Sequence, residues 1–177
     1  MSSKSRWFII AATISILCAF GTAGLAQHRN SAKGPVEFSL KSIDGPAVTA
    51  ESVRGEVVVL AFGASWLPLS RQQLESLKKF ADDYSGRGVA VYWVSTDSES
   101  SGSRNYASDD QLRALASKYK VTILRDPDGA LSKRVGVDQL PAFVILDKQG
   151  NLYANIGGFD PNTNLTDQLE PRLKPIL

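Results

Sequence analysis

Cysteine is almost absent from this chain, whose 177 residues contain only Cys18. Cys18 lies in an N-terminal stretch with the composition of an export segment, so the domain that follows has no thiol of its own. Such a domain cannot form an internal disulfide, and its stability must come from its hydrophobic core. Cycling between a dithiol and a disulfide is excluded for the domain alone, because the nucleophile in that chemistry is a thiolate.

Histidine and an excess of charge are also missing from the domain. The only histidine, His28, lies in a polar stretch ahead of the folded pattern. Removing residues 1–26 takes away Lys4 and Arg6, so the 20 basic residues fall to 18 and balance the 18 acidic ones. This balance does not favour nucleic acid as a partner. Because the sequence contains no metal-ligand cluster, phosphate-binding glycine loop or hydrolase triad, we predict neither a metal nor a cofactor.

Residues 1–26 have the pattern of an export signal. Two basic residues precede an apolar stretch at 7–20, and small residues lead to a candidate cleavage point at Ala26. The alternative is an uncleaved anchor, because residues 7–26 are uncharged and about long enough to span a bilayer. We favour cleavage, since glycine and threonine dilute the later half of the stretch. Both interpretations place the domain outside the cytoplasm, periplasmic or secreted, and the second tethers it to the membrane through residues 7–26.

The remaining chain predicts a linker and one domain. Residues 27–34 are polar and precede a proline, which indicates the linker, and residues 35–177 form the domain. Continuous apolar runs at 57–62 and 89–94 predict buried central strands. An apolar stripe with helical spacing lies between these runs and predicts a helix, whose end is marked by Gly86 and Gly88.

The second half of the domain continues the alternation. Residues 98–107 predict an exposed, solvated loop, and Ser108 with Gln111 then forms a capping box for a helix. A short helical stretch up to Val135 is followed by two strands, at 142–146 and 152–156, which should pair as an antiparallel hairpin. We therefore predict an α/β fold with a mixed sheet.

The C-terminal helix is less regular in its sequence signals. Asn164 with Asp167 provides a candidate cap, and Pro171 is expected to break or kink the helix midway.

Four stretches together resemble one known family, the thioredoxin-like reductases of the TlpA and redoxin (AhpC/TSA-like) type. The resemblance runs from about residue 35 to 158. It implies a thioredoxin-like fold, with a mixed central β-sheet flanked by helices on both faces. The stretches are Phe38-Ser39-Leu40 with Asp44-Gly45 and Val53-Arg54-Gly55, Ala64-Ser65-Trp66-x-Pro68-x-x-Arg71, Asp126-Pro127-Asp128-Gly129, and Gly136-Val137-x-x-Leu140-Pro141-Ala142-Phe143-x-Ile145-x-Asp147-x-x-Gly150.

Both active-site cysteines of that family are replaced in this chain. The resemblance puts them at Leu67 and Ser70, at the N-terminus of a helix that would stabilise a thiolate. Leucine has no nucleophile, and a serine hydroxyl needs a base to react. Gln73 stands where related reductases often have a glutamate, and Ala61 where thioredoxin has a buried acid. Neither position offers an acid for proton transfer.

The resemblance also implies a surface that could bind a peptide. In the family the bond before the proline at Pro141 is cis, which exposes the preceding backbone, here Leu140, to an extended chain. The alternative, which we favour, is that this loop serves only the fold. The neighbouring apolar residues are expected to add a docking surface, or else Leu67 fills the space of a thiol. The candidate binding residues are Trp66, Leu67, Pro68, Leu69, Ser70, Leu140 and Pro141.

Two functions remain open from the sequence. The first is a non-catalytic thioredoxin-fold module that holds an extended peptide or protein partner outside the cytoplasm. The second is a thiol-disulfide oxidoreductase or antioxidant-family protein that works with cysteines supplied by a partner. The missing thiols favour the first.

Overall fold

The computed structural model describes residues 34–177. The predicted signal or anchor at 1–26, most of the linker, Cys18 and His28 lie outside these residues. Within residues 34–177, no helix has both the length and the apolar composition needed to cross a membrane.

Strands and helices alternate along the chain, as the sequence predicted. The strands form one seven-stranded sheet in the order β2-β1-β5-β4-β3-β6-β7. Strand β4 is parallel to β3 and to β5, and the other pairs are antiparallel, so the prediction of a mixed sheet is confirmed. The elements are β1 (Ser39–Ser42), β2 (Val48–Thr49), β3 (Val57–Gly63), α1 (Pro68–Tyr84), β4 (Val89–Ser95), α2 (Asp109–Tyr119), β5 (Ile123–Arg125), α3 (Ala130–Arg134), β6 (Ala142–Leu146), β7 (Leu152–Gly157), α4 (Leu165–Leu173) and the 3-10 turn η1 (Lys174–Ile176).

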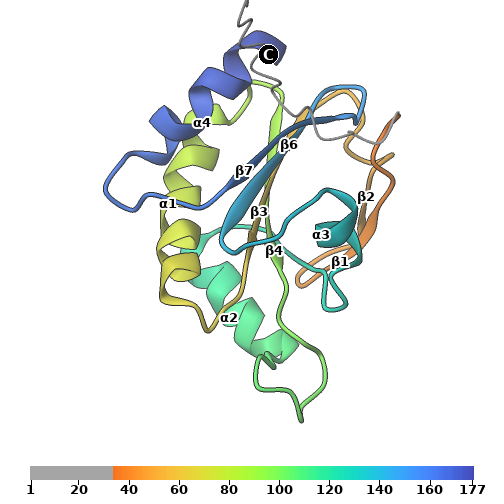
Figure 1. Cartoon of the computed structure of the whole chain (residues 1–177), viewed down its shortest axis with the longest axis vertical. Coiled ribbons are helices and arrows are strands. Elements are labelled where there is room, and N and C mark those ends of the chain that lie inside the picture. The colour runs from red at the N-terminus through yellow and green to blue at the C-terminus, as the bar shows by residue number, and fades with distance from the viewer. Residues whose placement is uncertain (1–33) are drawn as a thin grey trace, which may run out of the picture.

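Helices cover both faces of the sheet, which also confirms the predicted architecture (Figure 1). Helices α1, α2 and α4 pack on one face, and α3 packs on the other. All seven residues of β3 are buried, because alternate side chains of this central strand enter the two cores. On β3, Val57, Val59 and Ala61 face α1, whereas Val58, Leu60 and Phe62 face the α3 side.

The helix ends test two local predictions. The capping box at the start of α2 is present, with Ser108 accepting from the Gln111 amide and Gln111 accepting from the Ser108 amide. Asn164 caps α4 as predicted. The expected break at Pro171 is wrong, because α4 continues through it. The proline removes one backbone donor, but the helix buries Leu165, Leu169 and Leu173 against the core and is held by that packing.

The serine-rich segment at 98–107 is exposed at its tip, as predicted, but both of its ends are tied together. Ser98 and Tyr106 form an isolated β-bridge, and the Ala107 amide donates to the Ser98 carbonyl at 3.2 Å. Ala107 itself is buried. The segment is therefore a closed loop rather than an open connection.

Candidate functional site

The sheet brings the two predicted binding segments to one edge. The α1 turn, defined here as residues 64–69, leaves the carboxyl end of β3 and leads into α1. Phe62 pairs with Ala142, so the next residues along these antiparallel strands, Gly63 and Pro141, lie opposite each other. The Leu140–Pro141 peptide bond is cis. The loop before β6 therefore lies beside the α1 turn.

The α1 turn exposes apolar side chains. Trp66 is 55% exposed and Leu69 is 36% exposed, and these are two of the four large exposed hydrophobic residues in residues 34–177. Pro68 is also exposed, and Leu67 is half-buried. Ser70 is completely buried, so it adds nothing to the predicted surface, because the first turn of α1 directs this side chain into the core.

The neighbouring loop contributes less surface than predicted. Pro141 is buried at the start of β6, and Leu140 is half-buried and packs on the α3-side core. The loop can still offer backbone, because no hydrogen bond involves Leu140 N–H or C=O within residues 34–177. The surface at this edge therefore consists of Trp66, Pro68 and Leu69, with part of Leu67 and Leu140.

A buried carboxylate that the sequence analysis missed holds the α1 turn in place. Asp97 is fully buried just after β4. Its side chain accepts from the Ser65 amide at 2.9 and 3.1 Å, from the Ser65 hydroxyl at 3.1 Å and from the Ser95 hydroxyl at 2.7 Å. Arg71 Nε also donates to the Ser65 carbonyl. Ser65, the residue before Trp66, is thus held through its amide, hydroxyl and carbonyl.

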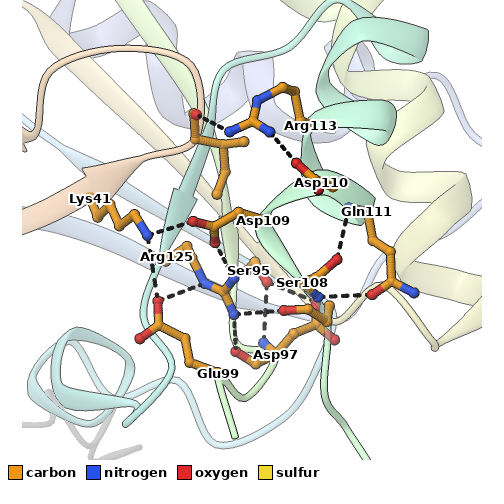
Figure 2. Close-up of polar contacts among 12 residues, drawn as sticks. Lys41, Ser95, Asp97, Glu99, Ser108, Asp109, Asp110, Gln111, Arg113 and Arg125 are labelled. Atoms are coloured by element: carbon orange, nitrogen blue, oxygen red, sulfur yellow. Dashed lines mark hydrogen bonds and ion pairs between the residues drawn. The ribbon is translucent and has the colours of Figure 1, made fainter. Parts of the chain in front are cut away.

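Asp97 is in turn fixed by the buried side chain of Arg125, as Figure 2 shows. Arg125 Nη2 donates to the carbonyls of Asp97, Ser98 and Ala107 at 3.0–3.3 Å, and Nη1 donates to Asp109 at 2.6 Å. Arg125 Nε lies 3.3 Å from a carboxylate oxygen of Glu99. This guanidinium joins both ends of the 98–107 loop to the segment that carries Asp97, and so supports the α1 turn indirectly.

Lys41 completes this charged cluster from β1. Its ammonium lies 2.6 Å from the second carboxylate oxygen of Asp109. The hydrogen bond from Lys41, together with that from Arg125, holds the pKa of Asp109 below its usual value of 3.8.

Gln73 lies buried beneath the turn and forms two hydrogen bonds that need an amide. Its carbonyl accepts from the Trp93 indole at 3.1 Å, and its amide nitrogen donates to the Ala142 carbonyl at 3.1 Å. The indole packs so closely under Gly63 that a Cβ there would lie 2.8 Å from the ring. An ionised glutamate at position 73 could accept from the indole but could not donate to Ala142.

The α1 turn offers no thiol. Residues 34–177 contain no cysteine. Within the same residues, no group of three or more histidine, cysteine, aspartate or glutamate side chains is placed to hold a metal ion. What the site presents is an apolar surface on an internally anchored turn.

The sequence is similar to a known protein family and to individual proteins. A family model described as the AhpC/TSA family matches residues 32–155. The thioredoxin-like protein YneN of Bacillus subtilis is 30% identical over 116 residues, which cover 64% of each chain. The thiol-disulfide oxidoreductase ResA of Bacillus thuringiensis is 24% identical over 182 residues, which cover 98% of each chain.

Solved structures agree on the fold. The exposed lipoprotein thioredoxin Etrx1 of Streptococcus pneumoniae has a TM-score of 0.61 and 26% identity, over 77% of this chain and 99% of its own. The thioredoxin-like fold predicted from the sequence is therefore confirmed.

Proposed function

This chain belongs to the AhpC/TSA family, and we propose that it is an extracytoplasmic, non-catalytic member that binds an extended peptide or protein partner at the α1 turn. The chain is similar to thiol-disulfide oxidoreductases, but its thioredoxin-like domain lacks the thiols on which their chemistry depends. According to this proposal, the domain keeps the binding surface of the fold but does not carry out its redox reaction.

The proposal rests on one observation: the α1 turn exposes an apolar surface, and hydrogen bonds to Ser65 hold the turn. The side chains of Trp66 and Leu69 are exposed. They follow Ser65 in the chain, and Asp97 and Arg71 hold Ser65 in place by hydrogen bonds. A turn whose backbone is already held loses less conformational entropy on binding. Tryptophan is also enriched among the residues that dominate binding energy. The unpaired backbone of Leu140 adds a donor and an acceptor for an extended partner.

The proposed location rests on two observations. The N-terminal 26 residues have the pattern of an export signal or anchor. Etrx1, which has the same fold, is named as an exposed lipoprotein. Attachment of this chain to a membrane through residues 7–26 is the second part of the same proposal.

The first experiment separates binding from catalysis. Disulfide reduction of insulin is measured with the full chain carrying Cys18→Ser, and with the same chain carrying Leu67→Cys and Ser70→Cys. We expect the first protein to be inactive and the second to be active, because only the thiols are missing. Activity of the cysteine-free chain would contradict the proposal. Activity only when a cysteine-bearing protein is added would favour the oxidoreductase with partner-supplied cysteines, which the similarity to ResA supports.

The second experiment measures binding directly. Reduced and carboxymethylated insulin B chain, labelled with a fluorophore, serves as an unfolded probe in an anisotropy titration. Trp66→Ala is expected to weaken binding by about tenfold or more, as for a tryptophan at the centre of an interface. Tyr153→Ala is the control, because Tyr153 is 41% exposed on β7, away from the α1 turn. Equal affinities of the two variants would overturn the assignment of the turn.

A further inference from the structure

The chain enters the described part of the domain beside the turn that joins β6 to β7. Pro35 forms an isolated β-bridge with Asn151, and the amide of Val36 donates to the Gly150 carbonyl at 2.8 Å. The candidate anchor at 7–26 is therefore joined to the domain next to the β6–β7 turn.

The α1 turn lies at the opposite end of the sheet. The β6–β7 turn follows Leu146, which pairs with Val58 at the start of β3. The α1 turn follows Gly63, at the other end of β3. Figure 1 shows the same arrangement, with the β6–β7 turn at one end of the sheet and the start of α1 at the other. Strand β3 has seven residues, so these two ends are about 20 Å apart.

The segment between the anchor and the domain, residues 27–33, is short compared with the domain. Seven residues span at most about 25 Å when fully extended. For the α1 turn to touch the bilayer that holds the anchor, this segment would have to run back along the whole domain, about 20 Å. Almost all of its length would then be used, whereas the opposite orientation makes no such demand. The tether therefore favours an α1 turn that points away from the bilayer.

This orientation decides between two occupants of the apolar surface on the α1 turn. Exposed tryptophan and leucine side chains are typical of segments that lie on a membrane, and tryptophan is also typical of protein interfaces. Trp66 and Leu69 therefore fit either occupant by their chemistry alone. A surface at the far end of a tethered domain meets the aqueous compartment and not the lipid.

We infer that the α1 turn faces away from the membrane that tethers the domain, and that its partner is a water-soluble polypeptide. The partner presents an apolar side chain to Trp66 and Leu69 from the aqueous side. This inference rests on the proposed function, including the tether through residues 7–26, and it specifies the partner: a polypeptide free in the compartment, not the bilayer or a segment lying on it.

Quenching by a labelled lipid tests the orientation. The full chain carrying Trp7→Phe is reconstituted in vesicles of phosphatidylcholine and phosphatidylglycerol, with or without phosphatidylcholine that bears a nitroxide on its headgroup. A nitroxide quenches tryptophan only at close range, and Trp93, the other tryptophan of this variant, is fully buried. We expect the nitroxide lipid to leave the emission of Trp66 unchanged.

A tryptophan at the other end of the sheet is the matched control. Gln149 is exposed in the β6–β7 turn, so Gln149→Trp is combined with Trp7→Phe and Trp66→Phe. We expect the nitroxide lipid to quench the tryptophan at position 149. A loss of emission at Trp66 that equals or exceeds the loss at position 149 would overturn the inference, and strong quenching of Trp66 would assign the surface to the bilayer.

Peptide titrations allow the two proposals to fail separately. The labelled, carboxymethylated insulin B chain is titrated against the full chain on vesicles, against the full chain in detergent micelles, and against a chain on vesicles that lacks residues 28–31. The deletion leaves three residues, about 10 Å, between the anchor and the domain. We expect the three affinities to agree within about twofold. Binding in micelles but not on vesicles would overturn the orientation and leave peptide binding at the α1 turn intact. Absence of binding in all three would refute the proposed function, whatever the quenching shows.

Discussion

Removing the Asp97 carboxylate should release the α1 turn and lower the stability of the domain. In Asp97→Ala, the Ser65 amide, the Ser65 hydroxyl and the Ser95 hydroxyl lose their acceptor. Each buried donor left unpaired costs about 1–3 kcal/mol. Ser65 is half-buried, so water can replace part of what it loses. We therefore expect the free energy of unfolding to fall by about 2–4 kcal/mol.

The loss in the free energy of unfolding should depend on which side chain replaces Asp97. Asp97→Asn keeps one acceptor oxygen but turns the other into an amide that faces donors, so about half of the loss is expected. Asp110→Ala is the matched acidic control, because the Asp110 side chain is 91% exposed and its pair with Arg113 lies on the surface. Such a pair contributes at most about 1 kcal/mol.

Urea denaturation followed by far-ultraviolet circular dichroism measures these differences, provided the denaturant slope is the same for all variants. A loss below about 1 kcal/mol for Asp97→Ala would refute the reasoning, since it would mean that the donors find other partners at no cost. The same variant should also weaken peptide binding at the α1 turn, because Ser65, the residue before Trp66, would lose its hydrogen bonds to position 97.

Two further predictions concern Gln73 and Asp109. Gln73→Glu should lower the free energy of unfolding at neutral pH by about 2–4 kcal/mol, because a buried carboxylate cannot donate to Ala142. Urea denaturation checks this, with Gln73→Met as an uncharged control of similar length, and wild-type stability of the glutamate variant would contradict it. The pKa of Asp109 lies below 3.8 in the folded state, chiefly through the hydrogen bond from Lys41, so its contribution is present above that pH and is lost as the pH falls through the folded pKa. Melting temperatures from about pH 5 to about pH 2 should therefore fall more steeply for the wild type than for Asp109→Asn, and parallel curves would exclude this role.

The fold could be predicted largely because its signals are local. The buried strands at 57–62 and 142–146 appear as continuous apolar runs, and the structure places β3 and β6 there. The capping box of Ser108 and Gln111 lies within four residues of the chain. Pro171 does not break α4, because the burial of three leucines from this helix, a property of the whole core, outweighs one lost backbone hydrogen bond.

The anchors of the site could not be predicted from the same kind of signal. Asp97 is 32 positions from Ser65, and Arg125 is 18 positions from Ala107. One feature could have indicated Asp97: it follows the carboxyl end of a predicted strand, and the carboxyl ends of parallel neighbours meet at one edge of a sheet. That Asp97 bonds to Ser65 depends on the register of β3 and β4, which no local pattern encodes.

The sequence by itself determined that the domain alone cannot cycle between a dithiol and a disulfide. No thiol follows Cys18, and no arrangement of the chain can supply one. Only the tertiary structure decided which of the two residues at the family's cysteine positions is exposed to solvent. Leu67 is partly exposed whereas Ser70 is buried, three residues along the same helix end. The reason is physical: residue types set the available chemistry, but exposure and hydrogen-bond partners are set by packing between segments far apart in the chain.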